Sequence, residues 1–329
     1  MMIALLAGLG SPATDLRLLS SLLRPVIALD RPPYRPPTKL WRRILIQSIA
    51  TSTQHLSTPT LDAQDASSQS SVSPTEISHF SRLASSWWDP HGPSRLLHLM
   101  NPHRHTFIGT CLSSIIPLRQ SRNRKGLRYL DIGCGGGIFA ESAARLPNTD
   151  TVTAIDPTPS VLAVAKEHQR NDPALSPPKL NYLNTAIEDL SIPASNDDKV
   201  DVITLFEVLE HIDRPSTFLG SCIPHLKRGG WIIGSTIARS PLSFLTTKLI
   251  AEAPLIGVVP PGTHDWNKYI NPDELEAWFE KRSRQAPGEE RWGNMKKQGV
   301  VYVPGLGWKM IPFSDGLGNY FFGVQRSVD

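Results

Sequence analysis

The chain of 329 residues is longer than an average single domain, and 40% of its residues are hydrophobic, which excludes a wholly disordered protein. Its net charge of +4 is unevenly divided, because residues 1–60 contain seven basic and two acidic side chains and the remaining chain is left with −1. A near-neutral body lacks the clustered basic residues that nucleic-acid binding requires, so we expect no nucleic-acid partner. Three widely spaced cysteines and the lack of any run of 18 apolar residues argue against a disulfide framework and a spanning helix.

Residues 1–75 read as a basic arm followed by a linker. Basic and apolar residues alternate at roughly helical spacing over 40–50, and hydroxyl-rich sequence follows over 51–60. An arginine-rich, serine-rich, acid-poor and amphipathic segment is typical of a mitochondrial transit peptide. A low-complexity tail would have a similar composition. So would extra residues that are included because the start of translation was placed upstream of the true one. We expect a transit peptide and disordered linker over 1–75 and one folded domain over 76–329.

Helical and strand patterns alternate through the folded domain. The expected helices cover 75–86, 95–100, 103–116, 138–145, 161–171 and 216–226, and the expected strands cover 128–132, 151–155, 180–184, 200–206 and 230–236. This alternation predicts an α/β fold with a mostly parallel sheet. Such sheets bind ligands beyond the carboxyl ends of their strands. The rule directs attention to Asp131 with the loop that follows it, to Asp156, and to the segment 206–211.

A glycine-rich loop over 133–137 directly follows the first strand. Glycines let a ligand approach the backbone closely and present amide donors at a helix start. A dinucleotide site is the main alternative, but its G-x-G-x-x-G pattern needs glycine where Ile138 stands. Asp131 would repel a pyrophosphate and favours a cationic ligand, while Asp156 can accept hydrogen bonds from ribose hydroxyls. Together these residues fit a cofactor built from adenosine and methionine.

Three potential metal ligands follow the fourth strand. Glu207, Glu210 and His211 stand at i, i+3 and i+4, so a helical segment would project them to one side. Two carboxylates and an imidazole suit a hard divalent ion, which would lower the pKa of a phenol from its usual value near 10. The alternative is a metal-free site in which this segment covers the cofactor and His211 acts as a general base.

An apolar insertion over 241–270 follows the fifth strand. Its apolar face is larger than a surface connection needs. One interpretation is a lid that dips into a bilayer interface, so that a lipid tail stays in the membrane while its ring enters the site. The other is an internal lid helix that packs on the sheet.

Several motifs carry a resemblance to a known family. Asp-Ile-Gly-Cys-Gly-Gly-Gly over 131–137 resembles motif I of the class I methyltransferases that use S-adenosylmethionine. Further segments resemble the ubiquinone-biosynthesis O-methyltransferases: Trp-Trp-Asp-Pro-His-Gly over 87–92, Asn-Pro-His-Arg over 101–104, Ala-Glu-Ser over 140–142, Phe-Glu-Val-Leu-Glu-His-Ile over 206–212 and Gly-Thr-His-Asp-Trp over 262–266. The similarity covers roughly residues 76–326, and its tryptophan and Gly-Thr-His-Asp segments are more specific than the glycine loop.

The resemblance implies a fold and a site. The fold is the Rossmann-like one of class I methyltransferases, a seven-stranded, mostly parallel sheet flanked by helices, with an antiparallel C-terminal strand; the last two strands lie within 299–303 and 318–325. The S-adenosylmethionine site comprises Arg104, Gly133, Asp156 and Phe206, and Phe206 stands in place of an expected methionine. Asp131, just before the glycine loop, and Gly135, within it, belong to the same site. Ile187 would lie along the adenine. A divalent ion, magnesium or zinc, would be held by Glu207, Glu210 and His211.

The resemblance also implies an activity and a location. Members methylate catechol-type hydroxyls of polyprenylated ubiquinone precursors, namely 3,4-dihydroxy-5-polyprenylbenzoate and demethylubiquinol. They work with other ubiquinone-biosynthesis proteins in a complex, in peripheral contact with the matrix side of the mitochondrial inner membrane. Two alternatives stay open: a methyltransferase for another small phenol, and a non-catalytic scaffold of that complex. The intact acidic and glycine residues of the site argue against a scaffold.

Overall fold

The computed structural model describes residues 71, 74–113, 126–247, 265–286, 290–303 and 305–328. Of the predicted transit peptide and linker over 1–75, residues 1–70 and 72–73 lie outside these residues, and so does the part of the predicted lid over 248–264. Among the helices that are described, none is both long and apolar enough to span a bilayer.

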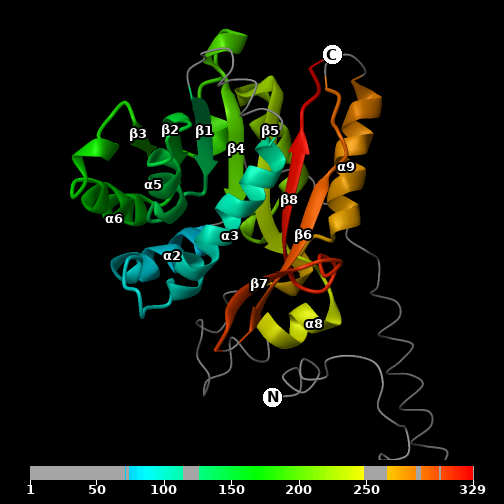
Figure 1. Cartoon of the computed structure of the whole chain (residues 1–329), viewed down its shortest axis with the longest axis horizontal. Helices are drawn as coiled ribbons and strands as arrows, with labels where there is room; N and C mark the ends of the chain where they lie inside the picture. The colour runs from blue at the N-terminus through cyan, green and yellow to red at the C-terminus, as the bar shows by residue number, and fades with distance from the viewer. Residues whose placement is uncertain are drawn as a thin grey trace, which may run out of the picture. The chain divides into compact units, whose positions relative to one another are not determined.

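A central eight-stranded sheet organises the fold (Figure 1), with the strand order β3-β2-β1-β4-β5-β8-β6-β7. Its strands are β1 Leu127–Ile132, β2 Thr149–Ile155, β3 Leu180–Leu183, β4 Val200–Phe206, β5 Leu226–Ile237, β6 Lys296–Val303, β7 Gly307–Ile311 and β8 Asn319–Gln325. The first five strands are parallel, and β8 runs antiparallel to both β5 and β6. The predicted Rossmann-like class with an antiparallel C-terminal strand is confirmed.

The sheet has eight strands where seven were expected, and the additional strand is β7. It pairs antiparallel with β6 at the edge of the sheet. Gly305, which lies between them, and Gly307, the first residue of β7, have φ of 81° and 74°, a left-handed conformation that glycine adopts without a Cβ clash. Edge strands with one exposed face give a short and weak hydrophobic pattern, and β7 has only five residues.

Helices flank the sheet: α2 Pro74–Leu83, α3 Arg95–Leu112, α5 Ile138–Ala144, α6 Pro159–Gln169, α7 Pro215–Cys222, α8 Pro241–Phe244 and α9 Pro272–Gln285. The predicted break between 100 and 103 is wrong, because α3 continues through Pro102. A proline inside a helix removes one backbone hydrogen bond and crowds the preceding turn. Buried Met100 and Phe107, on either side of Pro102, belong to the same apolar cluster, and this shared packing favours one continuous helix.

Two apolar layers hold these helices to the sheet. One layer joins α3, α5 and α6 to the sheet face that carries Tyr129, Val202 and Phe321. The other joins α7 and α9 to the opposite face, where Leu130 and Ile203 lie. Because side chains alternate along a strand, Asp131 projects to the same face as Tyr129, toward α3.

The strand order reverses between β1 and β4. From β1 the chain first builds outward to β2 and β3 and then returns to place β4 on the other side of β1. In open α/β sheets, ligands bind in the crevice outside the carboxyl ends of the strands at such a switch point. Asp131 near the end of β1 is in register with Thr204 of β4. The topology therefore positions a site over the loops that follow β1 and β4.

Candidate active site

The glycine loop after β1 has a backbone that few other residues could adopt. Gly133, Gly135 and Gly137 have φ of 69°, 53° and 88°. A Cβ atom at Gly133 would lie 2.7 Å from the Val208 side chain, so the loops after β1 and β4 are in direct contact. Glycine is required here both for the left-handed conformation and for the close approach.

The loop amides that the sequence predicted as donors to a ligand are largely used within the protein. The amides of Gly133 and Cys134 donate to the Ile155 carbonyl at 2.9 and 3.1 Å. The Gly135 amide donates to Asp156 Oδ2 at 3.0 Å. A ligand would therefore meet this loop mainly through close backbone contact and through the charged side chains around it.

Asp131 and Arg104 bring two incompletely satisfied charged groups to the switch point. Thr204 Oγ1 donates to Asp131 Oδ1 at 2.6 Å, but Asp131 Oδ2 and Arg104 Nε are buried and have no hydrogen-bond partner among the residues that the structure describes. Burial raises the pKa of Asp131 to about 7, although the Thr204 hydrogen bond and the Arg104 charge oppose the rise. Buried polar atoms are normally paired. An amino-acid-like ligand, with an ammonium and a carboxylate, would supply both missing partners.

Phe206 ends β4 beside the same arginine. The Arg104 guanidinium lies 4.9 Å from the centre of the Phe206 ring, a distance at which a cation is attracted to an aromatic face. Phe206 also contacts Phe139 of α5, with ring centres 4.7 Å apart. The structure thus brings together Arg104, Asp131 and Phe206, three of the residues predicted for the cofactor.

Asp156 follows β2 and is fixed in place by two backbone amides. Its Oδ2 accepts from Gly135 at 3.0 Å and its Oδ1 from Thr158 at 2.8 Å. Burial raises the pKa of Asp156, and these hydrogen bonds counteract that rise. A carboxylate has about four acceptor positions; the Thr158 side chain also hydrogen-bonds to Asp156, so one position stays available for a ribose hydroxyl. Ile187, in the short helix after β3, is buried.

The three predicted metal ligands do not converge. The expected helix after β4 is only a single 3-10 turn over Leu209–His211, and Glu207 has a left-handed φ of 57°. Glu207 Oε1 accepts from Ser235 at 2.5 Å, and Glu210 Oε2 accepts from Thr236 at 2.8 Å. His211 instead interacts with Glu76 of α2. Different neighbours therefore hold the three side chains.

The consequence is that the predicted metal set does not fit the observed geometry. Within the described ranges, no group of three or more His, Cys, Asp or Glu side chains is placed to hold a metal ion. The prediction assumed helical spacing, and the positive φ at Glu207 breaks that spacing at its first residue. We therefore derive no chemical step through a metal.

Glu76 is a site residue that the sequence did not reveal. His211 Nδ1 lies 3.1 Å from Glu76 Oε2, and the Phe80 ring packs edge-on against the imidazole at 5.1 Å. Since a carboxylate only accepts, Nδ1 carries the proton and Nε2 of the neutral ring is left as the acceptor. Burial by itself lowers the pKa of His211, but the hydrogen bond and charge of Glu76, with Glu210 and Glu207, outweigh it and raise that pKa overall. No spacing signal could have linked residues 135 positions apart.

Comparison with known proteins identifies relatives of this chain. The methyltransferase domain family matches residues 78–282. The ubiquinone biosynthesis O-methyltransferase of Candida albicans, a mitochondrial protein by its name, is 39% identical over 290 residues, covering 78% of this chain and 86% of the relative. The Schizosaccharomyces pombe protein of the same name is 40% identical over 263 residues, covering 78% and 88%. A solved S-adenosylmethionine-dependent methyltransferase from Thermotoga maritima is 16% identical, with a TM-score of 0.48, and covers 76% and 99%.

The fold and the matching domain define an enzyme of the class I methyltransferases. Within that class, the identity to the yeast proteins over most of both chains shows that this chain belongs to the ubiquinone biosynthesis O-methyltransferase family. The resemblance drawn from the tryptophan, glycine-loop and Glu-His motifs is thereby confirmed.

Proposed function

We propose that this enzyme transfers the methyl group of S-adenosylmethionine to a catechol-type hydroxyl of polyprenylated ubiquinone precursors, such as 3,4-dihydroxy-5-polyprenylbenzoate and demethylubiquinol. The observation that carries the proposal is the pair of buried, unpartnered atoms at the switch point, Asp131 Oδ2 and Arg104 Nε. They lie beside the glycine loop of a chain whose relatives are named for this pathway.

The cofactor fits the residues present by charge and by shape. Arg104 would bind the carboxylate of its methionine part. Asp131 would bind the ammonium and would attract the positive charge of the sulfonium. Asp156 would accept a hydrogen bond from the ribose, while Ile187 would line the adenine. Gly133 and Gly135, whose left-handed φ shapes the loop, would present its backbone to the cofactor.

His211 would activate the acceptor. The phenol oxygen attacks the methyl carbon as the bond between that carbon and sulfur breaks, and the phenol proton passes to His211 Nε2. Methyl ether and S-adenosylhomocysteine are the products. Glu76 stabilises the imidazolium that forms. Alignment of two bound reactants can contribute about 7–11 kcal/mol, and no covalent intermediate on the protein is required.

A methyl-transfer assay tests the proposal. We expect purified protein to methylate a short-chain demethylubiquinol analogue and a short-chain dihydroxybenzoate in preference to unsubstituted catechol. Retention of activity with a chelator would agree with activation by His211 and Glu76. Loss of activity that magnesium or zinc restores would instead reinstate the predicted metal role of Glu207, Glu210 and His211. Failure to methylate either acceptor would contradict the proposed function.

We further infer that the enzyme works in mitochondria, in peripheral contact with the matrix side of the inner membrane and beside other ubiquinone-biosynthesis proteins. The composition of residues 1–60 supports import. Membrane contact is supported by exposed apolar side chains on two adjoining segments: Phe244 and Leu245 at the end of α8, and Phe313 and Leu317 before β8. Ser240 at the start of α8 donates to the Leu317 carbonyl at 2.6 Å and joins the two segments.

Vesicle binding tests the membrane contact. Replacing Phe244 and Leu245 together with serine should weaken co-sedimentation with phosphatidylcholine–cardiolipin vesicles, because exposed apolar side chains drive interfacial insertion. The matched control replaces the exposed apolar residues Leu183 and Ile192 with serine. Equal vesicle binding by wild type and the Phe244/Leu245 variant would defeat the proposed contact.

A further inference from the structure

Two neighbouring tryptophans pack against the glycine loop. Trp88 Nε1 donates to the Gly136 carbonyl at 2.8 Å. The Trp87 ring lies so close that a Cβ atom at either Gly135 or Gly136 would be 2.3 Å from a ring atom. The loop is therefore held between Asp156, which accepts from the Gly135 amide, and this tryptophan pair.

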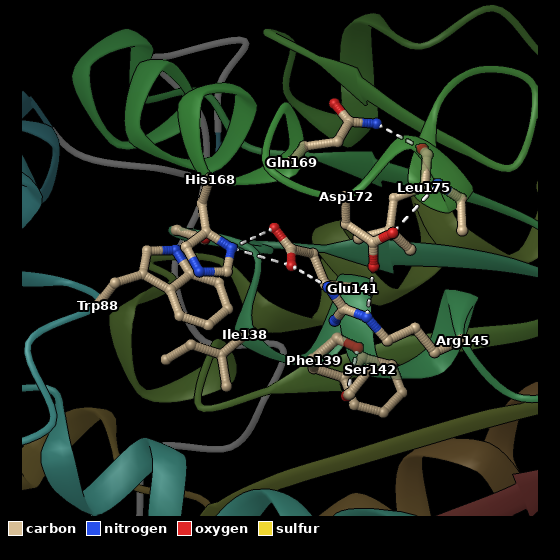
Figure 2. A network of polar contacts seen from close by, with 12 residues as sticks. Trp88, Ile138, Phe139, Glu141, Ser142, Arg145, His168, Gln169, Asp172 and Leu175 are labelled. Atoms are coloured by element: carbon tan, nitrogen blue, oxygen red, sulfur yellow. Dashed lines mark hydrogen bonds and ion pairs between the residues drawn. The ribbon is translucent and has the colours of Figure 1, made fainter.

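A histidine from α6 fixes the Trp88 ring. The imidazole of His168 stacks on the indole with ring centres 3.5 Å apart and planes within 1° of parallel. His168 Nδ1 lies 2.9 and 3.0 Å from the two carboxylate oxygens of Glu141 (Figure 2). Because the carboxylate only accepts, Nδ1 donates. That bond sets the plane of the imidazole and with it the plane of the indole.

Glu141 anchors this arrangement to the helix that the glycine loop begins. It is fully buried in α5, where an unpaired carboxylate would be costly. Arg145 donates to it at 3.0 Å and also pairs with Asp172 at 3.0 Å (Figure 2). Glu141, His168 and Trp88 thus form a continuous chain of contacts that starts one turn into α5 and returns to the carbonyl of Gly136.

We propose that Trp88 is a positioning residue for the cofactor, held in place by His168 and Glu141. The inference rests on the proposed function, since it takes the glycine loop to be the cofactor site. The Trp88 hydrogen bond fixes the carbonyl of Gly136, the residue after Gly135, and the Gly135 amide donates to Asp156. Loss of the bond would let the loop shift relative to Asp131 and Asp156, so cofactor binding would weaken while the acceptor side is unaffected.

The experiment compares two tryptophans that make equivalent bonds. Trp88→Phe removes the donor to Gly136 but keeps an aromatic ring. Trp308→Phe removes an indole bond of 2.9 Å to the Leu96 carbonyl from β7, at the edge of the sheet opposite β3. We expect the dissociation constant for S-adenosylhomocysteine, measured by isothermal titration, to rise about three- to tenfold in the Trp88 variant, as for loss of one hydrogen bond. KM for S-adenosylmethionine should rise in parallel with little change in kcat, and the Trp308 variant should bind like wild type.

A second variant keeps the inference falsifiable if Trp88→Phe does not fold. His168→Phe retains a stacking ring but loses the bond to Glu141, and it should also weaken S-adenosylhomocysteine binding without changing the acceptor KM. Unchanged affinity in the folded variants, or equal weakening in the Trp308 control, would overturn the positioning role. Failure of the wild-type protein to bind S-adenosylhomocysteine would be a different result, because it overturns the proposed function itself.

Discussion

His211→Asn is expected to lower kcat by about 10²–10⁴-fold, the range typical of a lost general base. The asparagine amide can still donate to Glu76, as Nδ1 does now at 3.1 Å, but it offers no basic nitrogen to the acceptor. Binding of S-adenosylhomocysteine should stay close to wild type. The measurement is a full kinetic profile with both substrates, combined with titration of the cofactor product.

The matched control for this variant is His225→Gln. His225 is also buried, but it lies directly before β5, at the opposite end of the strand from the site. The His225→Gln variant measures how much kcat falls when a buried imidazole is lost but the general base is retained. A fall in kcat of less than about tenfold for His211→Asn, or an equal fall for both variants, would contradict the assigned role.

Asp131→Asn is expected to weaken S-adenosylmethionine binding at pH 8 and to remove its dependence on pH. Burial raises the pKa of Asp131 to about 7, so the carboxyl of the free enzyme is mainly neutral at pH 6 and mainly ionised at pH 8. A cationic ligand prefers the ionised form, and by linkage affinity must rise with pH across this window. We expect wild-type affinity to be about tenfold higher at pH 8 than at pH 6.

A second buried carboxyl provides the control for this effect. Burial, reinforced by Glu207, also raises the pKa of Glu210 to about 7, and the pKa of His211 is raised as well, so a pH slope in the wild type could arise from any of these groups. Glu210→Gln should keep the slope and Asp131→Asn should lose it, as seen in titrations between pH 6 and 8. The reverse pattern would show that Asp131 is not the group that meets the positive charge.

The sequence predicted those site residues whose positions follow from strand ends. Asp131 and Asp156 stand where β1 and β2 end, and the alternation of side chains along a strand explains why Asp131 faces α3, the helix that carries Arg104. The same logic failed for Glu207, because its left-handed φ of 57° cannot be inferred from a Glu-x-x-Glu-His spacing that looks helical. Local patterns describe regular structure, and a single irregular residue redirects every side chain after it.

Partners from distant segments were beyond prediction for a different reason. Glu76 reaches His211 from a helix 135 positions earlier, and Trp88 reaches Gly136 across 48. The tryptophan motif marked its segment as specific to the family, but only the packing of α2 and α6 shows what those rings contact. Glu76, Trp88 and His168 needed the assembled fold.

Isothermal titration of the full-length protein with S-adenosylhomocysteine and, separately, with NAD⁺ tests the central claim most directly. The loop after β1 and the acids around it predict one adenosyl ligand per chain for the first compound and no heat of binding for the second. Saturable binding of the dinucleotide, or a protein that binds neither compound, would contradict the account.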